Sequence, residues 1–168
     1  NEIITITAQP AASQTACSGS TVNFSVTSTG TGITYQWKKN GTNLSNGGNV
    51  SGATSNTLTL TNVTTSESAN YTVVVSGVSP CAPVTSNIAA LVVNEIVAIT
   101  SQPAATQTVC SGNSVSFTVA ASGTGLSYQW KKGSLNLVNG GNVSGANTAT
   151  LTLNPVATGD AAADYSVE

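Results

Sequence analysis

The chain has 168 residues, of which 6% are charged, and its formal net charge is −2. This composition excludes the dense basic surface that nucleic acids and anionic membranes attract. Histidine and methionine are absent and there are only 3 cysteines, which argues against haem, zinc or redox chemistry and favours an extracellular or cell-surface location. We therefore expect no cofactor and no nucleic-acid partner.

The longest apolar run, Ile88 to Val93, is too short to span a bilayer. We expect no membrane insertion. No signal peptide precedes Asn1, so we expect a mature or excised segment of a secreted protein.

Three motifs recur at a constant distance of 93 residues. A unit that repeats in register is a building block of an array, and this length corresponds to two small domains. We expect domain 1 at residues 1–93 and domain 2 at residues 94–168. The motif pairs are Asn1–Ile3 with Asn94–Ile96, Cys17–Gly19 with Cys110–Gly112, and Tyr35–Lys39 with Tyr128–Lys132.

The second copy of the repeat stops early. Tyr71 corresponds to Tyr165 at a shift of 94, which places a one-residue insertion near Gly159 to Ala163. Nothing after Glu168 corresponds to residues 75–93. We therefore expect domain 2 to lack its final strand and to expose an uncovered groove over its core.

Apolar residues alternate with Ser, Thr and Asn in short segments that Gly- and Asn-rich turns separate. No segment shows sustained helical periodicity. Strands of this number and spacing predict an all-β fold of antiparallel sandwiches. The predicted strands lie near residues 3–7, 13–17, 21–28, 33–39, 42–45, 56–62, 70–77 and 85–93, and the same set recurs up to a truncated strand at 164–168.

Several of these strands resemble strands B, C, E and F of an immunoglobulin-like domain, namely Val22–Val26, the strand of Trp37, Leu58–Leu60 and Ser66–Val73. In that family a strand-C tryptophan packs on a disulfide between the sheets, and a tyrosine lies two positions before the second cysteine. Here the two cysteine positions hold Val26 and Val73, so the resemblance implies a core pinned by hydrophobic packing. The implied core residues are Trp37, Tyr71, Val26 and Val73, with Trp130 and Tyr165 in the second copy.

The Cys-Ser-Gly motif and Tyr35–Lys39 also resemble tandem immunoglobulin-like repeats of large secreted or surface proteins of Bacteroidota. This resemblance implies a structural or adhesive repeat of a surface protein or filament, without enzymatic activity. Its expected partners are neighbouring domains or identical subunits arranged head to tail. The alternative is a carbohydrate-binding accessory module of a secreted enzyme, with surface glycans bound at the duplicated loops Asn46–Asn49 and Asn139–Asn142.

The cysteines lie outside the usual disulfide pair of that family. Cys17 precedes strand B and Cys81 follows strand F, and these strands run in the same direction. We expect the two thiols at opposite ends of the domain, well beyond the ~7 Å between Cα atoms that a disulfide allows. In a head-to-tail array, Cys17, Cys81 and Cys110 are candidates for disulfides at the junctions, although an intradomain bond or free buried thiols are equally open.

No group of residues indicates catalysis, since histidine is absent and no activated nucleophile is visible. Asp160 and Asp164 are the nearest pair of acids. They could join backbone carbonyls in a calcium site, but their place in the loop before Tyr165 favours a structural role. We predict no catalytic, cofactor or metal site.

The open edge of domain 2 has two interpretations. The chain could be a fragment of a longer array. Alternatively, a neighbouring molecule could fill the groove with a strand, as in donor-strand complementation, and so build a filament.

Overall fold

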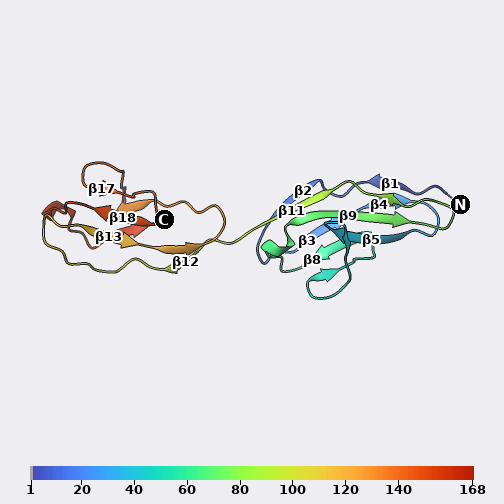
Figure 1. Cartoon of the computed structure of the whole chain (residues 1–168), viewed down its shortest axis with the longest axis horizontal. Helices are drawn as coiled ribbons and strands as arrows, with labels where there is room; N and C mark the ends of the chain where they lie inside the picture. Colours follow the sequence, from blue (N-terminus) through green and yellow to red (C-terminus); the bar gives the residue numbers. More distant parts are fainter. Residues whose placement is uncertain (1) are drawn as a thin grey trace. The chain divides into compact units, whose positions relative to one another are not determined.

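The computed structural model describes residues 2–168 and divides into two compact units, Asn1–Glu95 (unit 1) and Ile96–Glu168 (unit 2) (Figure 1). Both units are built from β-strands, and each adds a single short 3-10 helix, η1 (Thr65–Glu67) or η2 (Thr158–Asp160). The all-β prediction is confirmed. No helix among the described residues is long and apolar enough to cross a membrane.

Unit 1 contains one large sheet and one three-stranded sheet, with a separate pair, β1–β4. The large sheet has the order β2-β11-β9-β5-β6, and β10 also pairs with β9; the smaller sheet has the order β3-β8-β7. The strands are β1 (Thr5–Ala8), β2 (Ser13–Cys17), β3 (Val22–Ser25), β4 (Thr27–Thr29), β5 (Thr34–Lys39), β6 (Thr42–Asn43), β7 (Val50–Ser51), β8 (Thr57–Leu60), β9 (Ala69–Ser76), β10 (Val84–Thr85) and β11 (Ala89–Asn94).

The final strand of unit 1 joins two segments that are distant in sequence (Figure 1). β11 pairs in parallel with β2, from Ala90 opposite Ser13 to Asn94 opposite Cys17. On its other side β11 pairs antiparallel with β9, where Ala89 lies opposite Tyr71. β2 has no other partner in the sheet, so its place in the fold depends on β11.

The core of unit 1 lies between the two sheets, because apolar residues occupy alternate positions of the facing strands. Trp37 of β5 and Phe24 of β3 are fully buried, and their ring centroids lie 6.2 Å apart. Tyr71 of β9 stacks on Phe24 at 5.1 Å. Trp37 lies opposite Val73 in the β5–β9 ladder, so aromatic and aliphatic residues fill the place of a disulfide.

The strands of unit 1 differ from the prediction in several places, and the predicted strand 85–93 is divided into β10 and β11. The predicted strand 21–28 is divided at Val26, because β3 pairs with β8 whereas β4 pairs with β1. The chain thus changes sheets within one alternating segment. The short strand β7 was not predicted, because its two residues directly follow a glycine-rich loop and are too few to show an alternating pattern. β7 pairs with β8, and β17 pairs with β18 in the same way.

Unit 2 repeats this plan with fewer strands. Its sheets have the orders β13-β18-β17 and β16-β15-β19, with a separate pair β12–β14. The strands are β12 (Ala98–Ser101), β13 (Val115–Thr118), β14 (Ala120–Ser122), β15 (Trp130–Lys132), β16 (Leu135–Asn136), β17 (Val143–Ser144), β18 (Thr150–Leu153) and β19 (Tyr165–Val167). Within the described residues, no strand of unit 2 is equivalent to β11.

The strand predicted in the second copy at the position of β2 is wrong. Residues 106–110 correspond to 13–17 but form no strand. Polar and apolar residues alternate at both positions, so the local sequence does not explain the difference. The difference lies in the pairing partner, because β2 forms its ladder with β11, and the described part of unit 2 has no strand equivalent to β11. Strand formation in this segment is therefore imposed by tertiary pairing rather than by local propensity.

Candidate functional site

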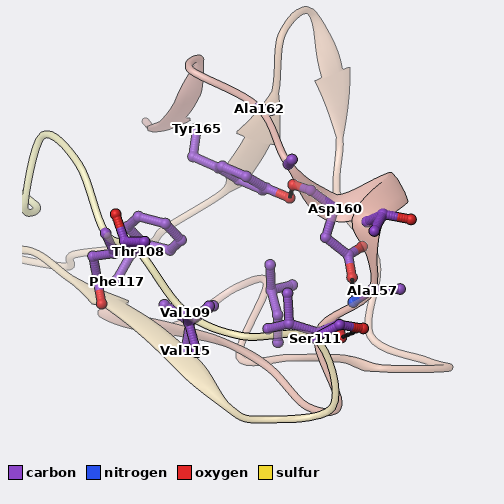
Figure 2. A pocket seen from close by; sticks show the side chains of 14 residues that line it. Thr108, Val109, Ser111, Val115, Phe117, Ala157, Asp160, Ala162 and Tyr165 are labelled. Atoms are coloured by element: carbon purple, nitrogen blue, oxygen red, sulfur yellow. Dashed lines mark hydrogen bonds between the residues drawn. The ribbon is translucent and has the colours of Figure 1, made fainter.

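The candidate site is an open groove over the core of unit 2. Two adjoining hollows of about 340 and 420 Å³ lie there, and both contact Gln107, Phe117, Ala162 and Tyr165. Figure 2 shows the rings of Phe117 and Tyr165 around the first hollow, with Val109 near its floor. We call the two hollows together the strand groove.

Burial of equivalent residues shows that the groove is specific to one side of unit 2. Phe24 and Tyr71 of unit 1 are each 0% exposed. Their counterparts Phe117 and Tyr165 are partly exposed, although they keep the same stacked contact, with ring centroids 5.2 Å apart. The two rings of unit 2 therefore keep the stacked packing of unit 1, but part of their surface stays exposed to solvent.

The opposite side of unit 2 is as well packed as that of unit 1. Trp130 and Leu151 are each 0% exposed. The Trp130 indole donates to the carbonyl of Thr148 at 2.9 Å, as the Trp37 indole does to that of Ser55. The groove is therefore a local opening in a folded unit.

Both walls of the groove are held in place by hydrogen bonds. On one wall, Gln107 donates its side-chain amide to the carbonyl of Ser116, and Ser111 Oγ donates to the carbonyl of Val156 at 3.2 Å. On the other wall, the Tyr165 hydroxyl donates to the carbonyl of Asp160 at 2.7 Å. The unpaired segment 106–110 is consequently anchored at both ends although it belongs to no sheet.

Asp160 serves the fold of its loop. Its Oδ2 accepts from the backbone N–H of Ala157 and from the Asn142 side chain, both at 2.8 Å. Burial raises the pKa of Tyr165 above its usual value, and the nearby charges of Asp160 and Asp164 raise it further. Among residues 2–168, no three His, Cys, Asp or Glu side chains converge in a way that could hold a metal ion.

The equivalent loop of unit 1 is a hydrogen-bonded cap on η1. Glu67 accepts from the Thr64 backbone N–H at 2.8 Å and from the Thr64 hydroxyl at 2.9 Å. Burial raises the pKa of Glu67, but these bonds, a bond from Ser66 and the charge of Lys39 outweigh it and hold that pKa below its usual value. The Tyr71 hydroxyl donates to the Glu67 carbonyl at 2.9 Å, which fixes the loop to β9.

We predict that Tyr71→Phe lowers the free energy of unfolding of unit 1 by about 1 kcal/mol at neutral pH, because the Glu67 carbonyl loses its donor. Burial, with the charge of Glu67, raises the pKa of Tyr71 to about 12, against about 10 for an unfolded tyrosine. The folded state therefore favours the protonated phenol. This stabilisation is complete below about pH 10 and is lost as the pH rises through about 12.

Urea denaturation of the wild-type chain and of Tyr71→Phe from pH 7 to 11.5 tests this prediction. The difference between the two proteins should shrink above about pH 10. Tyr165→Phe is the matched control, and its smaller effect follows from the partial exposure of that ring. If the difference in free energy of unfolding stays constant up to pH 11.5, the buried, protonated state of Tyr71 does not contribute as we predict.

Two lysines and two loop asparagines, at equivalent positions of the two units, bind the protein's own backbone. Lys39 Nζ donates to the carbonyl of Ser66 at 2.7 Å, and Lys132 Nζ donates to that of Gly159 at 2.6 Å. The side-chain oxygen of Asn46 accepts from the backbone N–H of Ala53 at 2.8 Å, and Asn139 repeats this bond. Each of these four side chains therefore has a structural contact in its own unit.

The three cysteines are free thiols. Cys17 lies opposite Asn94 at the end of β11, whereas Cys81 Sγ lies 3.7 Å from the carbonyl oxygen of Glu2. These positions lie beyond opposite ends of β9, whose 8 residues span on the order of 25 Å. Cys110 is exposed at the equivalent position in unit 2.

Sequence reasoning placed an opening in the second repeat but did not identify the residues that line it. Gln107, Val109 and Phe117 were missed, because none carries a chemical motif. The signal that could have found them is the 93-residue period, which relates Phe117 to the fully buried Phe24. The insertion lies between Asp160 and Tyr165, since the tyrosine bond spans 5 residues here and 4 in unit 1.

Comparison with known proteins supports the fold of both units. A family model described as an immunoglobulin domain matches residues 5–77. A search of curated protein sequences finds no match to this chain.

The solved structures that are similar to this chain contain immunoglobulin domains in tandem. A three-domain fragment of titin, I67–I69 with Glu-to-Ala substitutions, superposes with a TM-score of 0.77 at 16% identity, over 94% of this chain and 57% of that chain. Domains 1–4 of Sidekick-1 superpose with a TM-score of 0.74 at 19% identity, over 95% of this chain and 43% of that chain. The structure of the insect immune protein hemolin has implications for homophilic adhesion. It superposes with a TM-score of 0.66 at 15% identity, over 95% of this chain and 41% of that chain.

The chain thus spans between 41% and 57% of the length of these structures. At these identities the likeness establishes the fold alone. The predicted architecture of tandem immunoglobulin-like β-sandwiches is confirmed.

Proposed function

We propose that these two immunoglobulin-like sandwiches form a structural and adhesive repeat of an extracellular or cell-surface protein. The insect immune protein hemolin, whose structure has implications for homophilic adhesion, has a similar fold and supports this role. The sequence resemblance to repeats of bacterial surface proteins points to a bacterial array or filament. In such an array, residues 1–93 and 94–168 are successive repeats, joined where β11 ends at Asn94 and β12 begins at Ala98.

The observation that carries this proposal is that both units use their polar loop residues to hold their own backbone. The duplicated bonds of Asn46 and Asn139 close the same loop in each unit. Lys39 and Lys132 fasten the 3-10 turns. A surface organised in this way serves a domain that must be stable and repeated, whereas an enzyme needs groups left available for substrate.

The positions of the cysteines are compatible with disulfide bonds between neighbouring repeats. Cys17 and Cys81 lie at opposite ends of unit 1, as a head-to-tail disulfide between neighbouring repeats or chains requires. An extracellular oxidant would convert one thiol of each repeat into the bond, with loss of two protons and two electrons. Non-reducing peptide mapping of assembled material tests this staple: peptides of Cys81 and Cys110 linked between chains support it, and a Cys17–Cys81 link within monomers overturns it.

The adhesive role predicts attachment without recognition of a particular sugar. Beads coated with the chain should adhere to one another or to bacterial surfaces, and a glycan array should give no signal that depends on the Asn-Gly-Gly-Asn loops. The test compares wild type with Asn49→Ala and Asn142→Ala, which spare the bonds of Asn46 and Asn139. Strong binding to one glycan class that both substitutions abolish would instead identify a carbohydrate-binding module.

A further inference from the structure

Three Asn–Gly pairs lie in exposed loops and turns of the chain: Asn40–Gly41, Asn46–Gly47 and Asn139–Gly140. In such a pair the backbone nitrogen of glycine can attack the side-chain carbonyl carbon of asparagine, because glycine has no Cβ to hinder the approach. The reacting atoms are adjacent in the chain, so the step needs no partner molecule to bring them together. Each pair therefore has the chemistry to modify itself.

The side-chain amides of the three asparagines are held in the same way. In each of them Oδ1 accepts a backbone N–H, which stabilises the negative charge that develops on this oxygen during the attack. The donors are Asn70 to Asn40 at 3.0 Å, Ala53 to Asn46 at 2.8 Å and Ala146 to Asn139 at 2.8 Å. All three asparagines are exposed. Neither the amide nor its access to water distinguishes the three pairs.

The attacking nitrogens differ. The Gly47 N–H donates to the Val50 carbonyl at 2.9 Å, and the Gly140 N–H donates to the Val143 carbonyl at 2.9 Å. Each of these bonds must open before its nitrogen can attack. Among residues 2–168, no acceptor is found for the Gly41 N–H. Gly41 is thus the one glycine of the three whose nitrogen is available in the folded chain.

The turn between β5 and β6 explains why this N–H is free. Lys39 lies opposite Thr42, so Asn40 and Gly41 are the central residues of a two-residue hairpin turn. Both have a positive φ, 48° and 84°, as the type I′ turn of a tight hairpin requires. The flanking residues close the ladder, and the second central N–H has no ladder partner. The N–H and Oδ1 of Asn40 are both bound to Asn70, which holds the amide at the sheet beside the free nitrogen.

We propose that Asn40–Gly41 is a site of self-modification, at which the folded chain converts the Asn40 amide to a carboxylate while Asn46 and Asn139 are retained. A bond forms between the Gly41 nitrogen and Asn40 Cγ, the Cγ–Nδ2 bond breaks, and the Gly41 proton leaves with the amide nitrogen as ammonia. Water then opens the cyclic imide. Cleavage of the new bond gives aspartate, and cleavage of the original peptide bond gives isoaspartate, whose backbone runs through the side chain.

Isoaspartate would loosen one edge of unit 1. It adds a methylene group to the backbone of a turn that has only two residues, and β6 depends on this turn because it pairs with β5 alone, over two residue pairs. In unit 2 the corresponding turn is Gly133–Ser134, which has no reactive amide. The modification is therefore specific to the first repeat. It follows from local geometry and goes beyond the adhesive role, on which it does not depend.

The experiment ages the folded 168-residue chain in mildly alkaline buffer and follows each asparagine by peptide mapping with mass spectrometry. Asn40 should be lost at least about 10-fold faster than Asn46 and Asn139, because their attacking nitrogens are released only when a hydrogen bond opens. The products should be aspartate and isoaspartate, with one oxygen taken from heavy-oxygen water. In concentrated urea, where the fold is absent, the three rates should agree within about 3-fold.

Two results overturn the proposal. One is loss of Asn46 or Asn139 as fast as loss of Asn40 in the folded chain, because the hydrogen bonds of Gly47 and Gly140 would then give no protection. The other is a folded chain in which Asn40 persists while urea exposes all three asparagines to loss, because the turn would then protect its own amide.

The variant Asn40→Gly, which copies Gly133 of unit 2, tests the effect on β6. The Leu44 N–H donates to the Trp37 carbonyl at 2.9 Å just beyond this strand. Aged wild type should lose hydrogen-exchange protection at Leu44, whereas aged Asn40→Gly should keep the protection that it had when fresh. Equal loss in both proteins overturns the link between this turn and the edge of unit 1.

Discussion

Replacement of Trp37 by Ala should lower the free energy of unfolding of unit 1 by roughly 3–5 kcal/mol. The side chain is 0% exposed, it lies 6.2 Å from Phe24 between ring centroids, and its indole donates to the carbonyl of Ser55 at 2.9 Å. Ala removes the apolar contacts, leaves a cavity and deprives that carbonyl of its donor. Since a small domain has a total stability of about 5–15 kcal/mol, the loss is a large part of the whole.

Chemical denaturation followed by circular dichroism measures this loss, and the chain contains its own control. Trp130 is fully buried in unit 2, so its fluorescence in the Trp37→Ala protein reports a unit that the substitution does not touch. The Trp130 transition should stay where it is in wild type. Trp37→Phe keeps a ring and should cost less than Trp37→Ala. A cost below about 1 kcal/mol for the Ala variant would mean that the core does not depend on this side chain.

The fold was predictable from the sequence because its determinants are local and repeated. Alternation in segments such as Val22 to Ser25 follows from one buried face per strand, and the 93-residue period doubled the evidence for each strand. Val26 and Val73, at the two positions where immunoglobulin-like domains have their disulfide, are 3% and 0% exposed.

The sequence predicted an uncovered groove in the second copy, but not its effect on the segments that would pair with the final strand. Residues 13–17 and 106–110 have similar sequences, yet only the first form a strand, because β11 pairs with them. The partial exposure of Phe117 has the same origin. Neither difference is encoded in the segment that shows it, because both copies have the same local pattern.

The loop before β8 also contains a constraint that composition does not reveal. Gly52 has a φ of +73°, and a Cβ built on it would lie 2.0 Å from the carbonyl oxygen of Thr57 and 2.8 Å from the Ser55 hydroxyl. Gly145 repeats both features, with a φ of +75° and 2.0 Å to the Thr150 carbonyl oxygen. The repeat therefore requires glycine here for two reasons, the left-handed backbone and the close approach of β8.

We expect Gly52→Ala to lower the free energy of unfolding of unit 1 by about 3 kcal/mol. Roughly 1–2 kcal/mol comes from placing a Cβ in the left-handed region, and the remainder from displacing the backbone at Thr57, where β8 begins. The displacement would also reach the core, because the Ser55 carbonyl in the same turn accepts from the Trp37 indole.

Two further glycines separate the causes of that loss. Gly41 has a φ of +84° with nothing within 4 Å of a built Cβ, so Gly41→Ala should show only the left-handed cost of about 1–2 kcal/mol. Gly159, which has neither constraint, should tolerate Ala with little change in unit 2. Denaturation followed by Trp37 fluorescence in a Trp130→Phe background measures the two unit 1 variants. If Gly52→Ala and Gly41→Ala lower the free energy of unfolding equally, the close approach of the Thr57 carbonyl adds no cost. That result would contradict the tight packing around Gly52.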